Sequence, residues 1–498
     1  PVLTTVLVLA TSLLHGEDTI TDAAIAYAIE EEYFFDEVVP ENDLDVRVRD
    51  GIVFLDGNVS NLLAKKHAAR IAETVKGVRS IANNIAVNAT EWITTTQLAR
   101  DIETAFALDP VVERYEVTVH VEDDGIVTLK GYVDSWQEKT FAGAVASSVR
   151  GVSKIKNDIE VILEHNRSDE EIQAEVKKRI RWNALLNHTL ITVEVKKGTV
   201  FLSGLVGSPA EKSQARMAAW IQGTRDVDAS RLKVEPLIRD NHQRLDAIEP
   251  RSDEAIKAAL VDAYSYDPRL YGFEIDPHVE SGWVTLRGKV DNLRAKEAVV
   301  GIANLTVGVT GVTDRIKIRP GVTRSDADLE SAIQTKLAQD PWLLTEKIEY
   351  SVHDGIARVG GMVYSQFAKM RCEVLVNSIE GIKEVENMIQ VTDGGSILLN
   401  DPYVWDHTLY PWNESESQAS KLSHVSGLTL KDKELADRIA MRLFWSPFVN
   451  HQGITVFVEN GVATLDGEVS SRLAKQTALS KAIMAGALRV ENNLIVEG

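Results

Sequence analysis

The sequence predicts an α+β protein made of six tandem αββαβ modules, each with a three-stranded mixed sheet and two helices on one face. Three observations lead to this fold class. A pair of glycines six residues apart occurs six times, an alternating apolar run precedes each pair, and a helix-like segment that ends in another glycine follows it. Self-similarity at a regular spacing is the signature of a repeat protein, so it overrides the roughly three domains that chain length alone suggests.

The glycine pairs predict a β-hairpin in each module. Each pair has the form of DGIVFLDG, and a period-two run such as LDVRV comes before it. Such runs separated by a turn that ends in glycine are typical of a hairpin, and we expect the first glycine to take a positive φ. The second closes the return strand, where a missing side chain permits close packing or a bend. The structural glycines are Gly51, Gly57, Gly125, Gly131, Gly198, Gly204, Gly282, Gly288, Gly355, Gly361, Gly461 and Gly467.

We expect a helix on each side of the hairpin. The first helix opens at an N-cap followed by Asp, as at Ser168, Ser252 and Ser325, which places an acidic residue at the positive end of the helix dipole. The second helix ends at a C-cap glycine such as Gly77, and a last apolar strand follows it. A unit of this size is marginally stable alone, so we expect neighbouring units to stabilise one another.

The repeat also sets the domain boundaries. An apolar N-terminal segment covers residues 1–18, and an aromatic and Ser-rich linker covers residues 393–429. Short joints connect most of the remaining units. The six modules are residues 19–89, 94–163, 168–236, 252–319, 325–392 and 430–498.

The hairpin pattern resembles that of the BON domain family, named for bacterial osmotically induced and nodulation proteins. A Gly-x-Val-x-Leu-x-Gly-x-Val core, as in residues 125–133, carries the resemblance. The Gly151-Val152 end of the second helix and Asn157 before the last strand also match. The third and sixth units depart from the pattern in detail. The resemblance implies a periplasmic or envelope protein that binds membranes or other hydrophobic surfaces and has no established catalytic residues.

Composition narrows the classes of function. The net charge of −20 repels phosphate backbones, so we expect no nucleic-acid partner. Cys372 is the one cysteine, so no internal disulfide can form, and its apolar helical run predicts a small buried hydrophobe. The eleven His residues are scattered without zinc-ligand spacing. No titratable cluster is common to the six copies, so the sequence predicts no catalytic residue, no metal and no cofactor.

One charged position does recur in every module, eight residues after the second glycine. A lysine near a helix start opposes the dipole, so its recurrence calls for a reason. Either its aliphatic stem packs over the hairpin with the ammonium in water, or it contacts an anion, an acidic partner or another module. These lysines are Lys65, Lys139, Lys212, Lys296, Lys369 and Lys475.

Two segments outside the modules are candidate contact sites. Residues 2–14 are nearly all apolar or small, which fits either the end of a secretory signal or a docking strand added to another sheet. The linker is either a plain tether or an aromatic docking arm, because clustered large aromatics rarely stay in water. Its four aromatic candidates are Tyr403, Trp405, Tyr410 and Trp412.

These features together predict a non-enzymatic scaffold that is periplasmic or extracellular. We expect homo-oligomers formed through the N-terminal segment and the aromatic linker, or binding to a membrane or envelope surface. A head-to-tail contact that does not close would give a filament or tube. The alternative is a monomeric periplasmic stress protein that binds phospholipid or client surfaces.

Overall fold

The computed structural model describes residues 20–34, 36, 38–39, 44–88, 93–109, 112, 117–162, 167–236, 251–270, 272–321, 324–344, 346–364, 366–391, 432–487 and 489–496. Within these residues the order helix, strand, strand, helix, strand recurs six times, which confirms the α+β fold class. The N-terminal segment and the linker, with Tyr403, Trp405, Tyr410 and Trp412, lie outside the described residues.

Module 1 shows the plan of every unit. Strands β1 and β2 form an antiparallel hairpin, and β3 and β4 pair with β2 in parallel, so β2 is the central strand of a mixed sheet. Its elements are α2 (Asp22–Phe34), β1 (Leu44–Arg49), β2 (Ile52–Val59), α3 (Leu62–Glu73), β3 (Ser80–Asn83) and β4 (Ala86–Val87).

Modules 2 and 3 repeat this plan, and module 3 has one continuous last strand. The elements of module 2 are α4 (Thr95–Ala107), β5 (Thr118–Val121), η2 (Asp123–Gly125), β6 (Ile126–Lys130), β7 (Tyr132–Val133), α5 (Trp136–Ser147), β8 (Lys154–Asn157) and β9 (Glu160–Val161). Those of module 3 are α6 (Asp169–Trp182), η3 (His188–Leu190), β10 (Ile191–Lys196), β11 (Thr199–Val206), α7 (Pro209–Ala219) and β12 (Asp226–Val234).

Modules 4 to 6 follow the same order. The elements of module 4 are α9 (Asp253–Tyr266), η5 (Pro268–Leu270), β13 (Ile275–Glu280), β14 (Trp283–Val290), α10 (Leu293–Leu305) and β15 (Gly311–Ile318). Those of module 5 are α11 (Asp326–Gln339), β16 (Lys347–His353), β17 (Ile356–Val363), α12 (Gln366–Asn377), β18 (Glu384–Asn387) and β19 (Gln390–Val391). Those of module 6 are α14 (Asp432–Trp445), η6 (His451–Gly453), β20 (Ile454–Glu459), β21 (Val462–Val469), α15 (Arg472–Met484), β22 (Arg489–Asn492) and β23 (Ile495–Val496).

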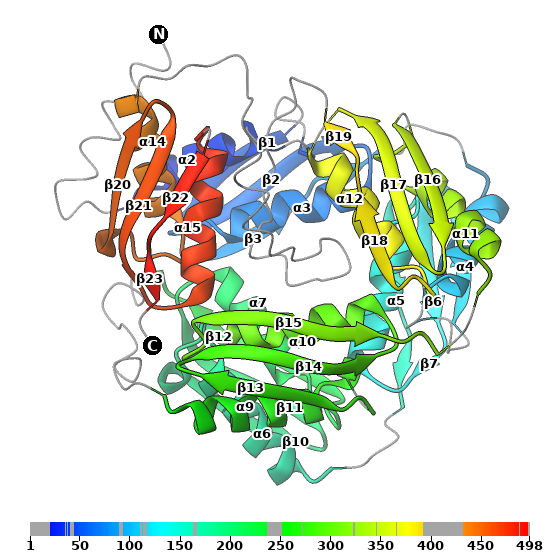
Figure 1. The fold of residues 1–498 in the computed structure, drawn as a ribbon, viewed down its shortest axis with the longest axis horizontal. Coiled ribbons are helices and arrows are strands. Elements are labelled where there is room, and N and C mark those ends of the chain that lie inside the picture. The colour runs from blue at the N-terminus through cyan, green and yellow to red at the C-terminus, as the bar shows by residue number, and fades with distance from the viewer. Residues whose placement is uncertain are drawn as a thin grey trace.

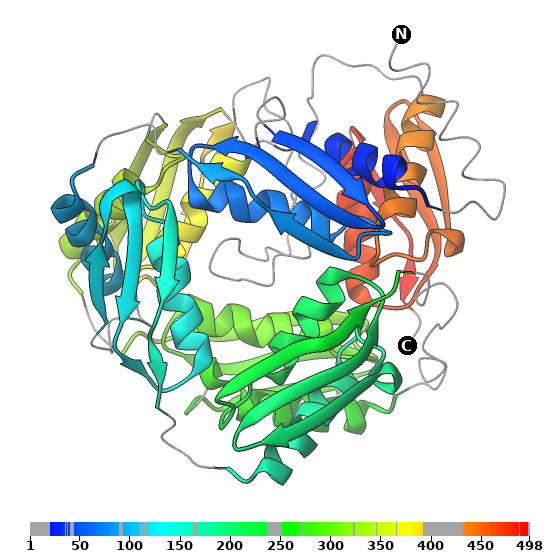
Figure 2. The ribbon, with the colours of Figure 1, turned by 180° about the vertical axis from the view of Figure 1, so that it is seen from behind.

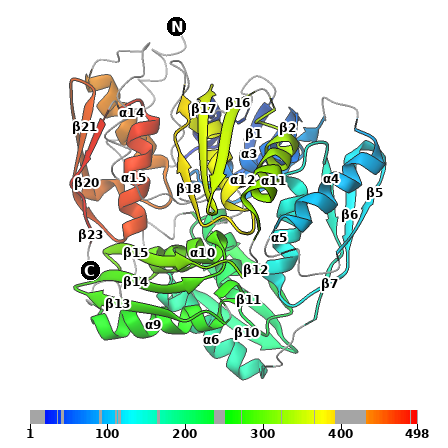
Figure 3. The same ribbon diagram turned by 45° about the vertical axis from the view of Figure 1, so that its right-hand side comes forward.

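Each module has a core between its helices and one face of its sheet. In module 1, Ile29 of α2 and Ala68 of α3 pack with Val53 and Leu55 of β2, and all four are fully buried. The period-two pattern of the strand puts these two β2 residues on the same face. Figure 3 shows α5 and α15 on the inner sides of their sheets, with β5 and β21 toward the outside.

The six modules form three pairs, in which module 1 meets module 6, module 2 meets module 5, and module 3 meets module 4. Modules 4, 5 and 6 face the viewer in Figure 1, and modules 1, 2 and 3 face the viewer in Figure 2. The chain therefore folds back on itself, and its three pairs surround a common centre (Figure 1). The backbone hydrogen bonds between paired modules lie on the helical side, and the outer sheet faces lie on the surface of the molecule (Figures 1 and 2).

Candidate functional site: turns, paired interfaces and outer sheet faces

A single aspartate holds the hairpin turn in five modules. Asp253 accepts hydrogen bonds from the backbone N–H groups of Ser281 (2.7 Å) and Gly282 (2.8 Å). Both turn residues have positive φ, as a type I′ turn requires. The equivalent residues Asp22, Asp169, Asp326 and Asp432 make the same two bonds. We call these five residues the turn-binding aspartates.

The sequence interpretation assigned these aspartates only to the helix dipole. Their second role had a signal, because in five copies an Asp stands 29 residues before the first glycine of the pair. Module 2 has Thr95 at the start of its first helix and therefore lacks this aspartate, although its turn residues Asp124 and Gly125 also have positive φ. In module 5, the bonds from the turn lower the pKa of Asp326 below its ordinary value.

Among the six second glycines of the pairs, those of modules 3 to 6 lie where the return strand passes a neighbouring carbonyl. All six have φ between 110° and 151°, which disfavours any side chain. A Cβ atom at Gly204 would overlap the carbonyl oxygen of Leu190, and one at Gly361 would overlap that of Lys347. These positions therefore need glycine for close backbone approach as well as for the dihedral angle.

The recurring lysines lie at the start of the second helix. The carbonyl oxygens of four of them (Lys65, Lys139, Lys369 and Lys475) accept a hydrogen bond from the Asn side chain that precedes the last strand. In module 4, Lys296 pairs with Asp314 of its own module at 3.0 Å. Partial burial lowers the pKa values of Lys65, Lys212 and Lys369. The position thus has a backbone role, and the anion or partner contact stays a prediction.

Reciprocal backbone hydrogen bonds join the paired modules. In five modules, the residue before the C-cap glycine donates its N–H to the carbonyl at the end of the first helix of the partner module. Arg150 donates to Gln339 (3.0 Å), and Glu380 donates back to Leu108 (3.4 Å). Modules 3 and 4 exchange the bonds Gln222 to Tyr266 and Val307 to Trp182, and Lys76 of module 1 donates to Trp445 of module 6. The pair of modules 2 and 5 and the pair of modules 3 and 4 are therefore built like two-fold dimers within one chain.

Charged residues are buried where the paired first helices meet. Glu32 of α2 accepts hydrogen bonds from Arg442 (3.1 Å) and Lys481 (2.9 Å) of module 6. Burial alone would raise the pKa of Glu32, but these two cations lower it. Glu32 and Arg442 occupy equivalent positions, ten residues after Asp22 and Asp432.

The same position is charged in the other two pairs. In module 3 it is Arg179, which bonds the carbonyl of Ala263 and the carboxylate of Asp267, both at 3.2 Å. In module 5 it is Lys336, which donates to Ser378 at 2.8 Å and whose pKa burial lowers to about 8. Sequence analysis did not single out this position, because one charged residue on a helix is normally solvated.

Two aspartates at the end of first helices form buried ion pairs, and one of these links two pairs of modules. Asp109 of module 2 is fully buried and binds Arg294 of module 4 at 2.6 Å. Asp340 binds Arg371 at 2.7 Å within module 5, also in the interior. In the sequence, each of these aspartates stands directly before a proline. Only the structure shows that their carboxylates are buried and paired.

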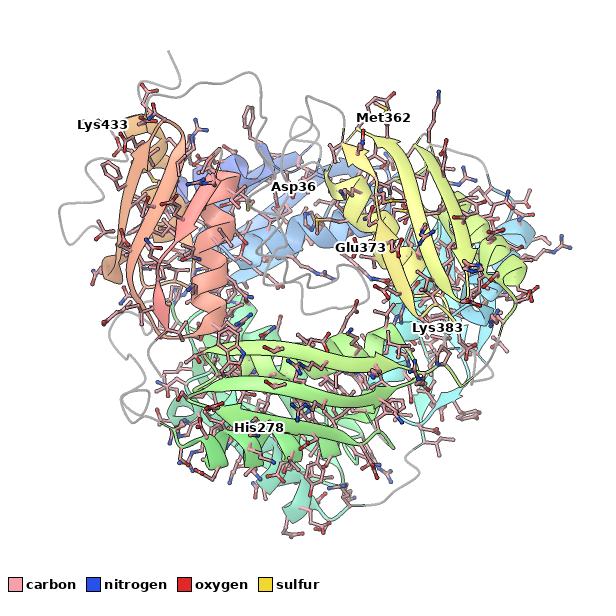
Figure 4. The ribbon with its side chains drawn as sticks, viewed as in Figure 1. Asp36, His278, Met362, Glu373, Lys383 and Lys433 are labelled. Atoms are coloured by element: carbon pink, nitrogen blue, oxygen red, sulfur yellow. The ribbon has the colours of Figure 1, made fainter. Side chains whose placement is uncertain are left out.

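The outer sheet faces expose large apolar side chains. Trp283 of module 4 is about half exposed, donates to Thr313 at 2.8 Å, and lies over Gly311, where a Cβ would overlap its ring. Figure 4 shows His278 on the same sheet and Met362 at the end of β17 in module 5. Other exposed residues of these faces are Tyr132, Tyr364, Met388, Phe457 and Ile495.

The described residues contain no group of three or more His, Cys, Asp or Glu placed to hold a metal ion. Cys372 is fully buried, as predicted, and burial raises the pKa of its thiol to about 12. Among the described helices, none is long and apolar enough to cross a membrane.

The BON domain family model matches six segments, residues 21–89, 94–162, 168–236, 252–320, 325–393 and 431–498. The chain belongs to the BON domain family. This confirms the resemblance carried by the hairpin glycines and places six BON domains in tandem. Each match coincides with one of the modules described above.

Two similar proteins put this BON-domain chain in context. Osmotically-inducible protein Y of Escherichia coli (strain K12) is 29% identical over 138 residues, which cover 26% of this chain and 67% of that protein. The solved C-terminal domain of CdsD, a structural protein of the Type III secretion system of Chlamydia trachomatis, matches at 15% identity. That match covers 44% of this chain and 99% of the domain, with a TM-score of 0.12.

Proposed function

We propose that this protein is a non-enzymatic scaffold of the bacterial cell envelope or exterior that binds other copies of itself through its outer sheet faces. One observation carries the proposal. The helical sides of the modules are used for pairing within the chain, whereas the outer faces expose side chains such as Trp283, Met362 and Tyr364. Exposed apolar side chains that gather on one face mark interaction sites.

The N-terminal segment 1–18 and the aromatic linker 393–429 are proposed as further contacts between copies. Their apolar and aromatic residues need a covering surface. If one copy offers these segments to the sheet of the next, the contact is head-to-tail and builds a filament or tube. If the rotation from one copy to the next brings the last copy back to the first, the contact builds a ring.

Light scattering and electron microscopy of the purified protein test self-association. Large regular particles are expected for the wild type, and the double change Met362→Ser with Tyr364→Ser is expected to reduce them. Gln334→Ser, at an exposed position of helix α11 in the same module, lies off the sheet face, so it is the control and should leave assembly intact. A monodisperse 55.0 kDa wild-type species would contradict the proposal.

The second candidate is a monomeric periplasmic stress protein that binds phospholipid or client surfaces. The pairing of modules favours this candidate, because all three pairs form their backbone hydrogen bonds within one chain. The name of the E. coli relative, which refers to osmotic induction, is consistent with a stress role. Flotation with neutral and anionic phospholipid vesicles tests lipid binding, and absence of the protein from every vesicle fraction would exclude it.

A further inference from the structure

A cavity of about 250 Å³ lies where modules 2, 3 and 4 meet. Helices α6 and α7 of module 3 and α9 and α10 of module 4 line it, and α5 of module 2 contributes a further wall. Its size approaches the lower end of the range of about 300–1,000 Å³ that small-molecule pockets occupy. Lys178 and Asp262, an ion pair in the wall, are equivalent residues of the two modules, so the cavity lies near their two-fold axis.

The walls of this cavity are largely aromatic. Trp136, Phe141, Trp182 and Trp220 all line it. The rings of Trp136 and Trp220 stack across the boundary between modules 2 and 3, with centroids 4.0 Å apart and planes 8° apart. Flat apolar groups and cations both bind well against such ring faces.

The basic groups in the wall already have acidic partners. Lys178 pairs with Asp262. Asp267 pairs with Arg179 at 3.2 Å and with Arg269 at 2.8 Å. Although burial alone would raise the pKa of Asp267, the two arginines lower it. An anionic ligand would therefore have to compete with a carboxylate for each cation.

Two side chains in the wall carry an oxygen that accepts no hydrogen bond from the described residues. Glu175 is 8% exposed and Gln214 is 4% exposed. One side-chain oxygen of each has no hydrogen-bond partner among the residues that the structure describes. Leaving a buried acceptor unsatisfied costs about 1–3 kcal/mol, so a donor near these groups would be stabilising. Burial raises the pKa of Glu175, and Arg179 and Lys178 offset this in part.

We propose that this cavity binds a small organic ammonium compound with a flat apolar body. The ammonium donates hydrogen bonds to Glu175 and Gln214, and the apolar body lies against the tryptophan rings. The wall offers two acceptor oxygens without a hydrogen-bond partner among the described residues. Its cations are already paired with carboxylates, so the site favours a cationic donor over an anion. The aromatic walls add cation–π attraction.

A glutamate at this position of the first helix occurs in the pair of modules 3 and 4 and in neither of the other two pairs. The position of Glu175 holds Ala28 and Arg438 in the pair of modules 1 and 6, and Asp101 and Ala332 in the pair of modules 2 and 5. The site is therefore a feature of this pair and not a property of every BON domain in the chain.

Isothermal titration calorimetry on the full chain near neutral pH tests the proposal with three ligands of similar size. These are 2-phenylethylammonium, the neutral 2-phenylethanol and the anionic 3-phenylpropionate. We expect saturable binding of the ammonium compound, about tenfold tighter or more than either of the others. Equal affinities, or no heat of binding from the ammonium compound, would overturn the proposal.

Glu175→Gln supplies the decisive variant, because it removes the charge and keeps the shape. We expect it to weaken binding of 2-phenylethylammonium by about tenfold and to leave that of 2-phenylethanol nearly unchanged. Glu170→Gln, at an exposed position of the same helix, is the matched control and should bind like the wild type. The contact between the ligand and the Trp136 ring is tested with Trp136→Phe. The change in tryptophan fluorescence on ligand addition is compared between this variant and the wild type. Unchanged ammonium affinity in Glu175→Gln would overturn the assignment.

Discussion

Single residues matter most where the modules bury charge. Lys336, Glu32 and Asp109 are each at most 8% exposed, and each has a specific partner. A buried charge costs free energy unless it is paired, so removing one partner is more harmful than a surface ion pair would suggest. The two predictions below concern a buried lysine and a turn-binding aspartate.

The free energy of unfolding should depend on Lys336 at alkaline pH. The pKa of Lys336 is about 8 in the folded protein, below its value in an unfolded chain. Between these two pKa values the unfolded state binds more protons, so stability should rise with pH by up to roughly 3 kcal/mol. In Lys336→Met this rise should disappear, as measured by urea unfolding from pH 8 to pH 10. Lys347→Met, at an exposed strand position, should keep it.

Loss of a turn-binding aspartate should destabilise its module. Asp253→Ala removes two hydrogen bonds from the hairpin turn and should cost about 1–3 kcal/mol. Faster amide hydrogen exchange at β13 and β14 is the expected measurement. Glu254→Ala changes the next, exposed residue and should leave this exchange nearly unchanged. Equal exchange in the two variants would show that the aspartate acts only on the helix dipole.

At the scale of the element, the central strands depend on glycine where a side chain would collide with neighbouring backbone. In modules 3 to 6, a carbonyl of the preceding segment approaches the central strand at its second glycine, which has a positive φ. The turn glycine and the turn-binding aspartate fix the other end of the hairpin. In modules 3 to 6, the hairpin is thus constrained at both ends by residues of its own module.

Two adjacent glycines in β17 test whether a close carbonyl makes glycine necessary. Gly361→Ala should destabilise module 5 by about 1–3 kcal/mol or more, because the residue has φ of 110° and its Cβ would overlap the carbonyl of Lys347. Gly360→Ala should change stability by no more than about 0.5 kcal/mol, since nothing lies within 4 Å of its Cβ. Thermal unfolding of the two variants makes the comparison, and similar melting temperatures would contradict it.

At the scale of the whole molecule, the chain is held together by the return of later modules onto earlier ones. The last module packs against the first, so its position depends on contacts far away in the sequence. Glu32 and Arg442 are 410 residues apart and yet form a buried ion pair. The described arrangement therefore depends on contacts between distant modules as well as between successive ones.

Breaking this ion pair should release module 6. Glu32→Ala leaves Arg442 and Lys481 without their buried carboxylate and should weaken the interface by about 3–5 kcal/mol. We expect a larger radius of gyration in small-angle X-ray scattering and faster proteolysis near residue 430. Glu30→Ala, on the exposed side of the same helix, is the control. Unchanged scattering from Glu32→Ala would mean that the pair contributes little to closure.

The internal fold of the modules was predictable because its determinants are local. Gly282 in the turn, the alternating residues of β14 and the N-cap Ser252 act on their near neighbours, and such effects depend only on nearby sequence. The second role of Asp253 had a signal in its fixed spacing from Gly282. The burial of Asp109 had none, because its partner Arg294 lies 185 residues away.

Periodicity and turn chemistry in the chain were thus enough to specify six copies of one module and the family they belong to. The choice of partner for each module was decided by tertiary packing. Six similar modules offer similar helical surfaces, so local sequence does not distinguish one partner from another. The charged residues at the centre of each interface, such as Glu32 and Arg442, acquire their meaning only when distant helices meet. For the same reason the aromatic cavity between modules 2, 3 and 4 exists only in the assembled molecule.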